Sequence, residues 1–382
     1  MNRSFDHWLV LFTAMLLAFG LVMVYSASAV IAEEEFGDPF KYLIRQTVAI
    51  GLGGVLAASM ALTPTRALQR FGLTAYAASV AGLIATHIPG LQYRANGAAR
   101  WIGAGGVNLQ PSEFAKIGVL MVLAYYLDRY RMHINNFRVL AGAAVIVAFP
   151  ALITLAQPDF GTTAIMVGLC GMMLYFAGLK WRIMLPFIGV GAAGAIALVW
   201  FEPYRLKRVT SFLDPWQSQQ GEGYHVIQSW VAMHSGGVEG QGLGNSIAKL
   251  HFLPEPWTDF IGAVIGEELG LVGMGVLIAL FVAFVWRGVL IAKRARTAFG
   301  SFLAATLSVM IGIEAFFNLA VILGMVPPKG LVLPFISYGS SATLANLWAV
   351  GILLSIAAEA QDQPPEQGWT AVATPLQAQP AR

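Results

Sequence analysis

Residues 253–286 read LPEPWTDFIGAVIGEELGLVGMGVLIALFVAFVW, and we interpret the chain as organised around this stretch. Two prolines stiffen its first part, and Asp259 stands where the loop becomes a long apolar run. As a helix, that run is long enough to cross the ~30 Å hydrocarbon core of a membrane. Glu267 and Glu268 follow about two turns inside the run, where acids are expensive in lipid. We therefore interpret Asp259 as a candidate catalytic base and the two glutamates as candidate supporting residues.

The composition of the whole chain agrees with a membrane environment. Of its 382 residues, 57% are hydrophobic and 11% are charged, whereas soluble domains carry about 25% charged residues. The net charge of +3 is not gathered in a basic tract, so nucleic-acid binding has no support. A lone cysteine, Cys170, excludes an internal disulfide, and the six histidines lack zinc-ligand spacing. The chain is therefore expected to be an all-α polytopic membrane protein.

Ten apolar runs indicate about ten transmembrane helices. They lie at about residues 8–31, 42–62, 71–88, 112–127, 139–156, 161–178, 183–201, 259–286, 301–325 and 342–358. The fifth and sixth runs can also be read as one broken hairpin. Residues 1–358 are thus predicted to form a single transmembrane domain. Residues 359–382, rich in Gln, Pro and Ala, are expected to form a disordered cytoplasmic tail.

The distribution of Lys and Arg orients these spans. One set of short connections carries eleven Lys and Arg residues and the other carries five, and the richer side should be cytoplasmic. Both termini are then cytoplasmic, and Asp259 lies outside. The one long connection, residues 202–258 between spans 7 and 8, forms a large extracytoplasmic loop. Its glycine-rich part, residues 236–246, suits close approach of the backbone to a ligand, although a flexible external loop is the simpler reading.

Polar residues on the predicted outer side form four further clusters. Glu113 and Lys116 open the fourth span three residues apart, so they can form a local ion pair, or Lys116 can offer its charge to an anionic head group. Asp159 can cap the sixth span. Arg100, beside Trp101, can anchor at the membrane interface or hold a phosphate.

The fourth cluster precedes the last span, where residues 327–341 read PPKGLVLPFISYGSS. This segment is too rich in Pro and Gly for a helix and too apolar for a free aqueous loop. Irregular backbone at membrane depth survives where protein buries it or where it lines a cavity, so Lys329, Ser337 and Ser340 are expected to face a cavity. Glu314 and Asn318, one turn apart, form a polar spot in the ninth span that can be structural only.

The run after Asp259 carries two further features. Gly262, Gly266 and Gly270 recur every four residues and predict a face that lets another helix approach closely. Glu267 lies about 12 Å deeper than Asp259, so it cannot share a proton with Asp259 but can anchor a cation from another span. The simpler reading of Asp259 is an N-cap of the helix.

Five motifs in order resemble the SEDS family (shape, elongation, division and sporulation) of bacterial cell-wall polymerases. They are residues 96–102, 110–116, 157–162, 254–270 and 329–341. Within the family, residues 242–246 and 328–331 are more similar to the division branch, FtsW, than to the elongation branch, RodA. The sequence Ser-Tyr-Gly-Ser-Ser at 337–341, one glycine shorter than the expected pattern, and Trp257 in place of a histidine depart from the family.

The resemblance implies a peptidoglycan glycosyltransferase that polymerises lipid II outside the bacterial cytoplasmic membrane, at the division septum in the FtsW branch. It also implies a class B penicillin-binding protein as transpeptidase partner, together with other membrane proteins of the division machinery. By motif position, Asp259 matches the family's essential aspartate. Glu113, Lys116 and Asp159 match other conserved polar positions of the family.

Such a reaction needs a base and cations. A sugar hydroxyl becomes a good nucleophile when a positioned carboxylate takes its proton, which favours Asp259. Negative charge develops on the departing pyrophosphate, so Lys116, Arg100 and Lys329 are candidate partners, with a divalent cation (Mg²⁺ or Mn²⁺) as a possible addition and no other cofactor expected. Two other classes remain open: a lipid II flippase or transporter, which would also use polar groups within spans, and a noncatalytic scaffold.

Overall fold

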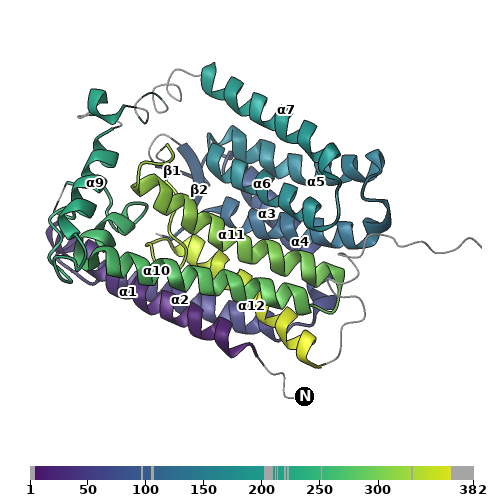
Figure 1. The fold of residues 1–382 in the computed structure, drawn as a ribbon, viewed down its shortest axis with the longest axis horizontal. Helices are drawn as coiled ribbons and strands as arrows, with labels where there is room; N and C mark the ends of the chain where they lie inside the picture. Colours follow the sequence, from purple (N-terminus) through teal and green to yellow (C-terminus); the bar gives the residue numbers. More distant parts are fainter. Residues whose placement is uncertain are drawn as a thin grey trace, which may run out of the picture.

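The computed structural model describes residues 5–95, 98–104, 107–201, 210, 212, 214–218, 221, 223–250, 252–327 and 330–362. Most of this part is helical (Figure 1). Its α-helices are α1 (His7–Phe36), α2 (Lys41–Ala61), α3 (Thr65–Ala85), α4 (Pro111–Tyr130), α5 (Phe137–Ala156), α6 (Phe160–Phe176), α7 (Trp181–Trp200), α9 (Tyr224–Gly236), α10 (Ile261–Arg294), α11 (Ala298–Ile322) and α12 (Ser340–Asp362). Short 3-10 helices cover Arg131–His133 and Pro215–Ser218. The predicted tail beyond residue 362 and residues 202–209 of the long loop lie outside the described residues.

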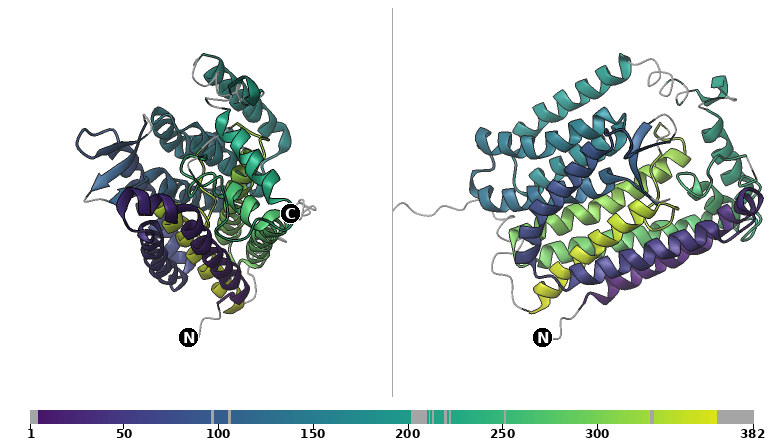
Figure 2. Two further views of the ribbon diagram at one scale, coloured as in Figure 1. Left: turned by 90° about the vertical axis from the view of Figure 1, so that its left-hand side faces the viewer. Right: turned by 180° about the vertical axis from the view of Figure 1, so that it is seen from behind.

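Each of the ten predicted spans overlaps one helix, from α1 to α7 and from α10 to α12. In the described part of the chain, six helices are long and apolar enough to cross a membrane: α1, α2, α5, α10, α11 and α12. The chain is therefore a multi-pass helical membrane protein, while a total of ten spans stays a prediction. α1 begins and α12 ends at the same end of the bundle (Figure 2). Fifth and sixth spans are separate helices, α5 and α6, joined at residues 157–159.

A small sheet corrects the all-α prediction. Between α3 and α4, the strands β1 (Gln92–Ala95), β2 (Ala98–Ala104) and β3 (Val107–Leu109) form an antiparallel sheet in the order β1-β2-β3. Tyr93 pairs with Trp101, and Gly103 pairs with Asn108. The sequence signal for the first hairpin is the dipeptide Asn96-Gly97, which is typical of two-residue hairpin turns. The sheet delivers the chain to Pro111, whose fixed φ suits the first turn of α4.

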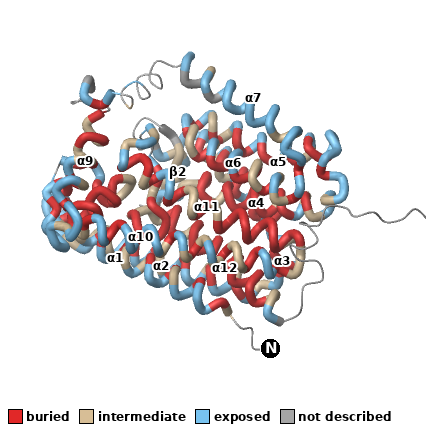
Figure 3. The backbone as a smooth tube through the Cα atoms, viewed as in Figure 1, coloured by how far each residue is buried: buried red, intermediate tan, exposed pale blue. Residues whose placement is uncertain are grey.

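The core of the bundle lies where α4, α11 and α12 pack together (Figure 3). α12 also packs along α2, and small residues allow the close approach, since a Cβ on Gly351 would lie 2.5 Å from the Ala57 carbonyl oxygen. α7 packs at one edge, beside α6, and its described side chains are mostly exposed. An apolar exposed face is what a helix in contact with lipid requires.

Two of the three spaced glycines in α10 meet other helices, as predicted. A Cβ on Gly262 would lie 2.6 Å from Ile322 Cδ1 on α11, and one on Gly266 would lie 3.1 Å from Met233 Cγ on α9. Gly270 instead breaks the helix, with φ 63° and ψ −162°. That conformation is open to glycine because glycine has no Cβ. α10 therefore consists of a first segment of residues 261–269 and a longer second segment that reaches Arg294.

Candidate active site

Asp259 lies in the loop that leads into α10, with its side chain half-buried. Thr258 Oγ1 lies 2.9 Å from Asp259 Oδ1 and 2.8 Å from the Glu255 carbonyl oxygen, so its one hydroxyl proton is shared by these two acceptors. Phe260, not Asp259, occupies the N-cap position of α10. The N-cap interpretation of Asp259 is therefore wrong, and its carboxylate needs another explanation.

Asn318 on α11 fixes the backbone around Asp259. Its Nδ2 donates a hydrogen bond to the Asp259 carbonyl at 2.9 Å and another to the Leu331 carbonyl. Gly330 lies beside the Asp259 carboxylate, since a Cβ on Gly330 would lie 3.6 Å from Asp259 Oδ2. Asn318, expected to be structural only, thus holds together two loops that are far apart in sequence. Lys329, the neighbouring candidate, lies outside the described residues.

Lys116 is buried at the centre of an ion network. Its Nζ contacts Glu113 Oε2 at 3.0 Å and forms a second ion pair with Glu314 of α11. The local pair predicted between Glu113 and Lys116 is confirmed. Lys116 is only 3% exposed, so the expectation that it presents its charge to a head group at the surface is corrected: two carboxylates take up that charge inside the protein. Such pairing is what makes a buried ammonium tolerable.

One face of α11 joins these two groups. Glu314 bonds Lys116, and Asn318, four residues later, bonds the backbone of Asp259. Residues four apart lie about 6 Å apart along a helix and on the same face. The structure therefore brings the Asp259 loop and the Glu113–Lys116 pair of α4 together around α11.

The segment after Gly330 is irregular and buried, one of the two settings expected for it, and Ser337 takes part in a local turn. Ser337 is buried, and its Oγ accepts a hydrogen bond from the Leu333 N–H at 2.8 Å, which stabilises a turn. Gln46 of α2, which the sequence analysis missed, donates from Nε2 to the Ser337 carbonyl and to Thr343 Oγ1 at 3.1 Å. A polar side chain within the apolar run 42–62 was the available signal. Ser340 is half-buried and begins α12.

An aromatic cluster joins this segment to the Asp259 loop. The ring of Trp257 lies 4.8 Å from that of Tyr42 on α2, and Tyr42 meets Tyr338 edge to face at 5.0 Å. The Tyr338 N–H donates to the Trp257 carbonyl at 2.8 Å. Trp257, which departs from the family pattern, is thus a packing residue two positions before Asp259.

Arg100 binds the connection between α5 and α6, just before Asp159. Arg100 Nη2 donates to the Pro158 carbonyl at 2.7 Å, and its Nε donates to the Gln157 carbonyl at 3.3 Å. Asp159 is buried and accepts a hydrogen bond from the Thr162 N–H, so the predicted N-cap of α6 is confirmed. In this arrangement Arg100 binds the carbonyl groups that precede Asp159.

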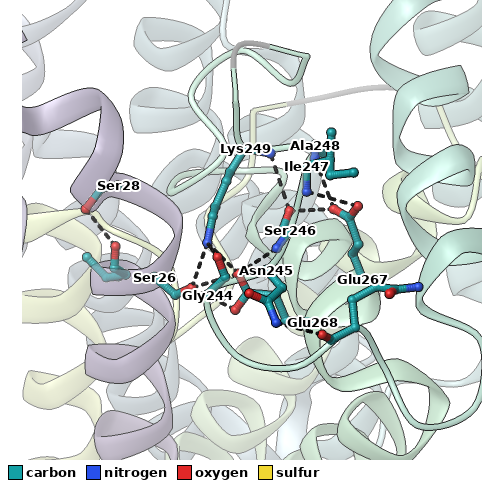
Figure 4. A network of polar contacts seen from close by, with 12 residues as sticks. Ser26, Ser28, Gly244, Asn245, Ser246, Ile247, Ala248, Lys249, Glu267 and Glu268 are labelled. Atoms are coloured by element: carbon teal, nitrogen blue, oxygen red, sulfur yellow. Dashed lines mark hydrogen bonds and ion pairs between the residues drawn. The ribbon is translucent and has the colours of Figure 1, made fainter. Parts of the chain in front are cut away.

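Glu267 and Glu268 bind the loop after α9 (Figure 4). Glu268 pairs with Lys249, and Glu267 accepts hydrogen bonds from the Ile247 and Ala248 N–H groups. The expectation that Glu267 anchors a cation from another span is corrected, because its partners are neutral donors of this loop. The sequence analysis missed Lys249, because nothing in the sequence alone pairs it with an acid 19 residues later.

A second carboxylate lies near Asp259. The pKa of Glu255 is raised above its ordinary value, first by partial burial and then by the negative charge of Asp259, while the hydrogen bond from Thr258 opposes the rise. Among the described residues, no group of three or more His, Cys, Asp or Glu side chains could hold a metal ion. Asp259 and Glu255 would be the protein's contribution to any cation bound here.

Comparisons with known proteins identify the relatives of this chain. The family of cell cycle proteins that comprises FtsW, RodA and SpoVE matches residues 7–362. The chain is 44% identical, over 92% of its length and 89% of the relative, to a "Probable peptidoglycan glycosyltransferase FtsW" of Allochromatium vinosum. It is 40% identical to "Stage V sporulation protein E" of Bacillus subtilis, over 93% of this chain and 97% of the relative.

Two solved structures share the fold. One, described as "Structural coordination of polymerization and crosslinking by a peptidoglycan synthase complex", matches with a TM-score of 0.78 and 27% identity over 94% of this chain and 99% of that chain. The other is the rod shape determining protein RodA of Thermus thermophilus, with a TM-score of 0.69 and 26% identity over 93% and 97%. The chain therefore belongs to the FtsW, RodA and SpoVE family of cell cycle proteins.

Proposed function

We propose that this protein is a peptidoglycan glycosyltransferase that polymerises lipid II at the outer face of the bacterial cytoplasmic membrane, in the septal wall. The names of its FtsW relatives and its likeness to a peptidoglycan synthase complex support this activity. Both favour it over a flippase, a scaffold and the elongation branch.

The observation that carries the proposal is the setting of Asp259. Its carboxylate is half-buried, beside Gly330, and its backbone is held by Asn318 from the core helix α11. A general base must be rigidly placed and still reachable by the group whose proton it takes. Asp259 would take the proton of the acceptor sugar hydroxyl. The hydroxyl oxygen then forms a bond to the anomeric carbon of the donor while the bond from that carbon to the pyrophosphate oxygen breaks.

The departing pyrophosphate needs positive charge. Lys116 binds two carboxylates and Arg100 binds two carbonyl groups, so both donate to partners inside the protein in this state. We assign the direct contact to Lys329 because it is next to Gly330 in the sequence, with Lys116 setting the charge behind the site. A divalent cation, if bound, would add charge to the leaving group.

The proposal includes a partner and a topology. The solved complex that couples polymerization with crosslinking supports a class B penicillin-binding protein as transpeptidase, alongside other division proteins. Ten spans with both termini in the cytoplasm place Asp259 outside, where lipid-linked precursor would be used. The start of α1 and the end of α12 at one end of the bundle fit that topology.

Polymerisation of purified lipid II tests the assignment. Asp259→Asn, bound to the partner, is expected to lower the rate at least 100-fold, because general-base catalysis is typically worth about 10²–10⁴-fold. Asp38→Asn is a matched control, since Asp38 is an exposed acid in the loop between α1 and α2. Near wild-type glycan synthesis by folded Asp259→Asn would refute the base. Transport of labelled lipid II across vesicles without any glycan product would support the flippase instead.

A further inference from the structure

The buried polar network at the break in α10 serves no step of the proposed reaction, yet hydrogen bonds and an ion pair join its residues closely (Figure 4). Its acids, Glu267 and Glu268, are 3% and 0% exposed. It joins α1, the loop of residues 237–250 (the α9–α10 loop) and both segments of α10.

Glu267 acts as an acceptor for the α9–α10 loop. Its carboxylate accepts hydrogen bonds from the Ile247 N–H at 3.2 Å, the Ala248 N–H at 3.1 Å and the Ser246 hydroxyl. Ser235, at the end of α9, donates a fourth bond at 3.2 Å. A carboxylate with several donors holds its partners in one geometry, because charge-assisted hydrogen bonds are strong and short. Glu267 thereby sets the position of the second half of the loop.

Glu268 and Lys249 form the charged half of the network. Lys249 Nζ lies 2.8 Å from Glu268 Oε1 and donates to the Gly244 carbonyl at 2.7 Å. Ser26 of α1 donates from Oγ to Glu268 at 2.7 Å. A buried ion pair contributes little net stability compared with an apolar pair, and its best-attested use is to select one arrangement. Here it selects one position of the loop against α1 and α10.

Backbone hydrogen bonds fasten the other half of the loop. Gly242 N–H donates to the Glu268 carbonyl at 3.0 Å, and the Leu271 N–H donates to the Gly237 carbonyl at 3.0 Å. A Cβ on Gly270 would lie 2.5 Å from the Gly240 nitrogen, and a Cβ on Gly240 would collide with the Glu268 carbonyl. At the break in α10, backbone N–H and C=O groups therefore lack their helical partners, and the loop supplies hydrogen-bond partners in their place.

The chain runs directly from this network to Asp259. Leu253 N–H donates to the Ala248 carbonyl at 2.9 Å, so the turn that follows Lys249 is also fixed. The aromatic contact of Trp257 with Tyr42 holds the far end. Asp259 thus follows a segment whose start is held by the network, and its own carbonyl is held by Asn318 of α11.

Resting on the glycosyltransferase function proposed above, we propose that Lys249, Glu267 and Glu268 are positioning residues, which fix the α9–α10 loop and through it place the Asp259 carboxylate. None of them touches substrate. Loosening the network then lowers the rate of the chemical step while leaving lipid II binding nearly unchanged.

The decisive variant replaces the ion pair by an apolar pair, Lys249→Met with Glu268→Met. It leaves no charge stranded, so its stability is expected to match that of the wild type. Its kcat for lipid II polymerisation is expected to fall about tenfold with KM within about twofold, since the loop is no longer tied to Ser26 and Gly244. The single variant Lys249→Arg keeps the charge and is expected to recover most of the rate. Glu239→Gln, an exposed acid in the same loop, is the matched control with wild-type kinetics.

A distance measurement separates this inference from the proposed function. Spin labels at Ile247→Cys and Val282→Cys, which are both 62% exposed, report on the loop relative to α10. Cys170 is buried, so labelling is expected at the introduced sites. A narrow distance distribution in the wild type that broadens in the double Met variant supports the proposal, even if no glycan is made. An unchanged distribution, or a rate that simply follows stability across the variants, would overturn it.

Discussion

Lys116→Met tests the ion network at the core of the bundle. In the wild type, the ammonium is 3% exposed and is shared by two buried acids, Glu113 and Glu314. Methionine has a similar length and no charge, so both acids lose their cation. Removing one partner of a buried pair costs about 3–5 kcal/mol because the remaining charge has lost its compensation. We expect a loss of unfolding free energy in that range.

Glu314→Gln is the matched comparison. It leaves the Lys116–Glu113 pair intact, and the amide oxygen can still accept a hydrogen bond from the ammonium. The expected loss of unfolding free energy is then the difference between a charge-assisted and a neutral hydrogen bond, about 1 kcal/mol. A triple variant, Glu113→Gln with Lys116→Met and Glu314→Gln, removes every charge and is expected to be more stable than Lys116→Met alone.

Unfolding in mixed micelles, followed by the fluorescence of the ten tryptophans, measures these differences. The expected order of stability is wild type, Glu314→Gln, then Lys116→Met. A Lys116→Met protein as stable as Glu314→Gln would refute the reasoning. A stable Lys116→Met protein without polymerase activity would return Lys116 to the role of a head-group cation, which its burial argues against.

Three further changes test other parts of the structure. Asn318→Ala leaves two loop carbonyls without their donor and is expected to cost about 1–3 kcal/mol of unfolding free energy and to slow lipid II polymerisation; an unchanged rate would show that Asp259 is held by other contacts. Gly270→Ala places a Cβ 2.5 Å from the backbone of the loop at φ 63°, so we expect it to lower the free energy of unfolding by more than about 1 kcal/mol. Gly275→Ala, which has open space around its Cβ, should be neutral or slightly stabilising in the same unfolding assay. Equal effects of the two substitutions would contradict the break in α10. Glu255→Gln tests a pH effect. Burial first, and then the charge of Asp259, raises the pKa of Glu255 above its ordinary value of 4.5, so the native state binds this proton more tightly than the unfolded state does. The wild type therefore gains stability below pH 4.5 and loses that gain as the pH rises through the raised pKa. The variant should lack this loss when unfolding is measured below and above that pH, and parallel pH profiles would refute the cause.

The sequence was sufficient to predict the features that depend on residues close together in the chain. The lengths of the apolar runs predicted the positions of the helices, because a segment that crosses lipid must make its backbone hydrogen bonds internally. The cap by Asp159 and the pair between Glu113 and Lys116 also followed from spacing along one helix, since residues three apart face the same way. The small sheet after α3 was missed although Asn96-Gly97 signals a hairpin, because the apolar pattern dominated the interpretation.

Which polar groups contact one another depends on how the helices pack. Glu314 lies 198 residues after Lys116 in the chain, and Lys249 meets Ser26 across 223 residues. Spacing carries no information at that range, since helix packing alone brings such groups together. The folding of the α9–α10 loop against α10 likewise gave Glu267 its backbone donors. The sequence therefore identified the acids, whereas their partners and their roles depend on how the helices and loops pack.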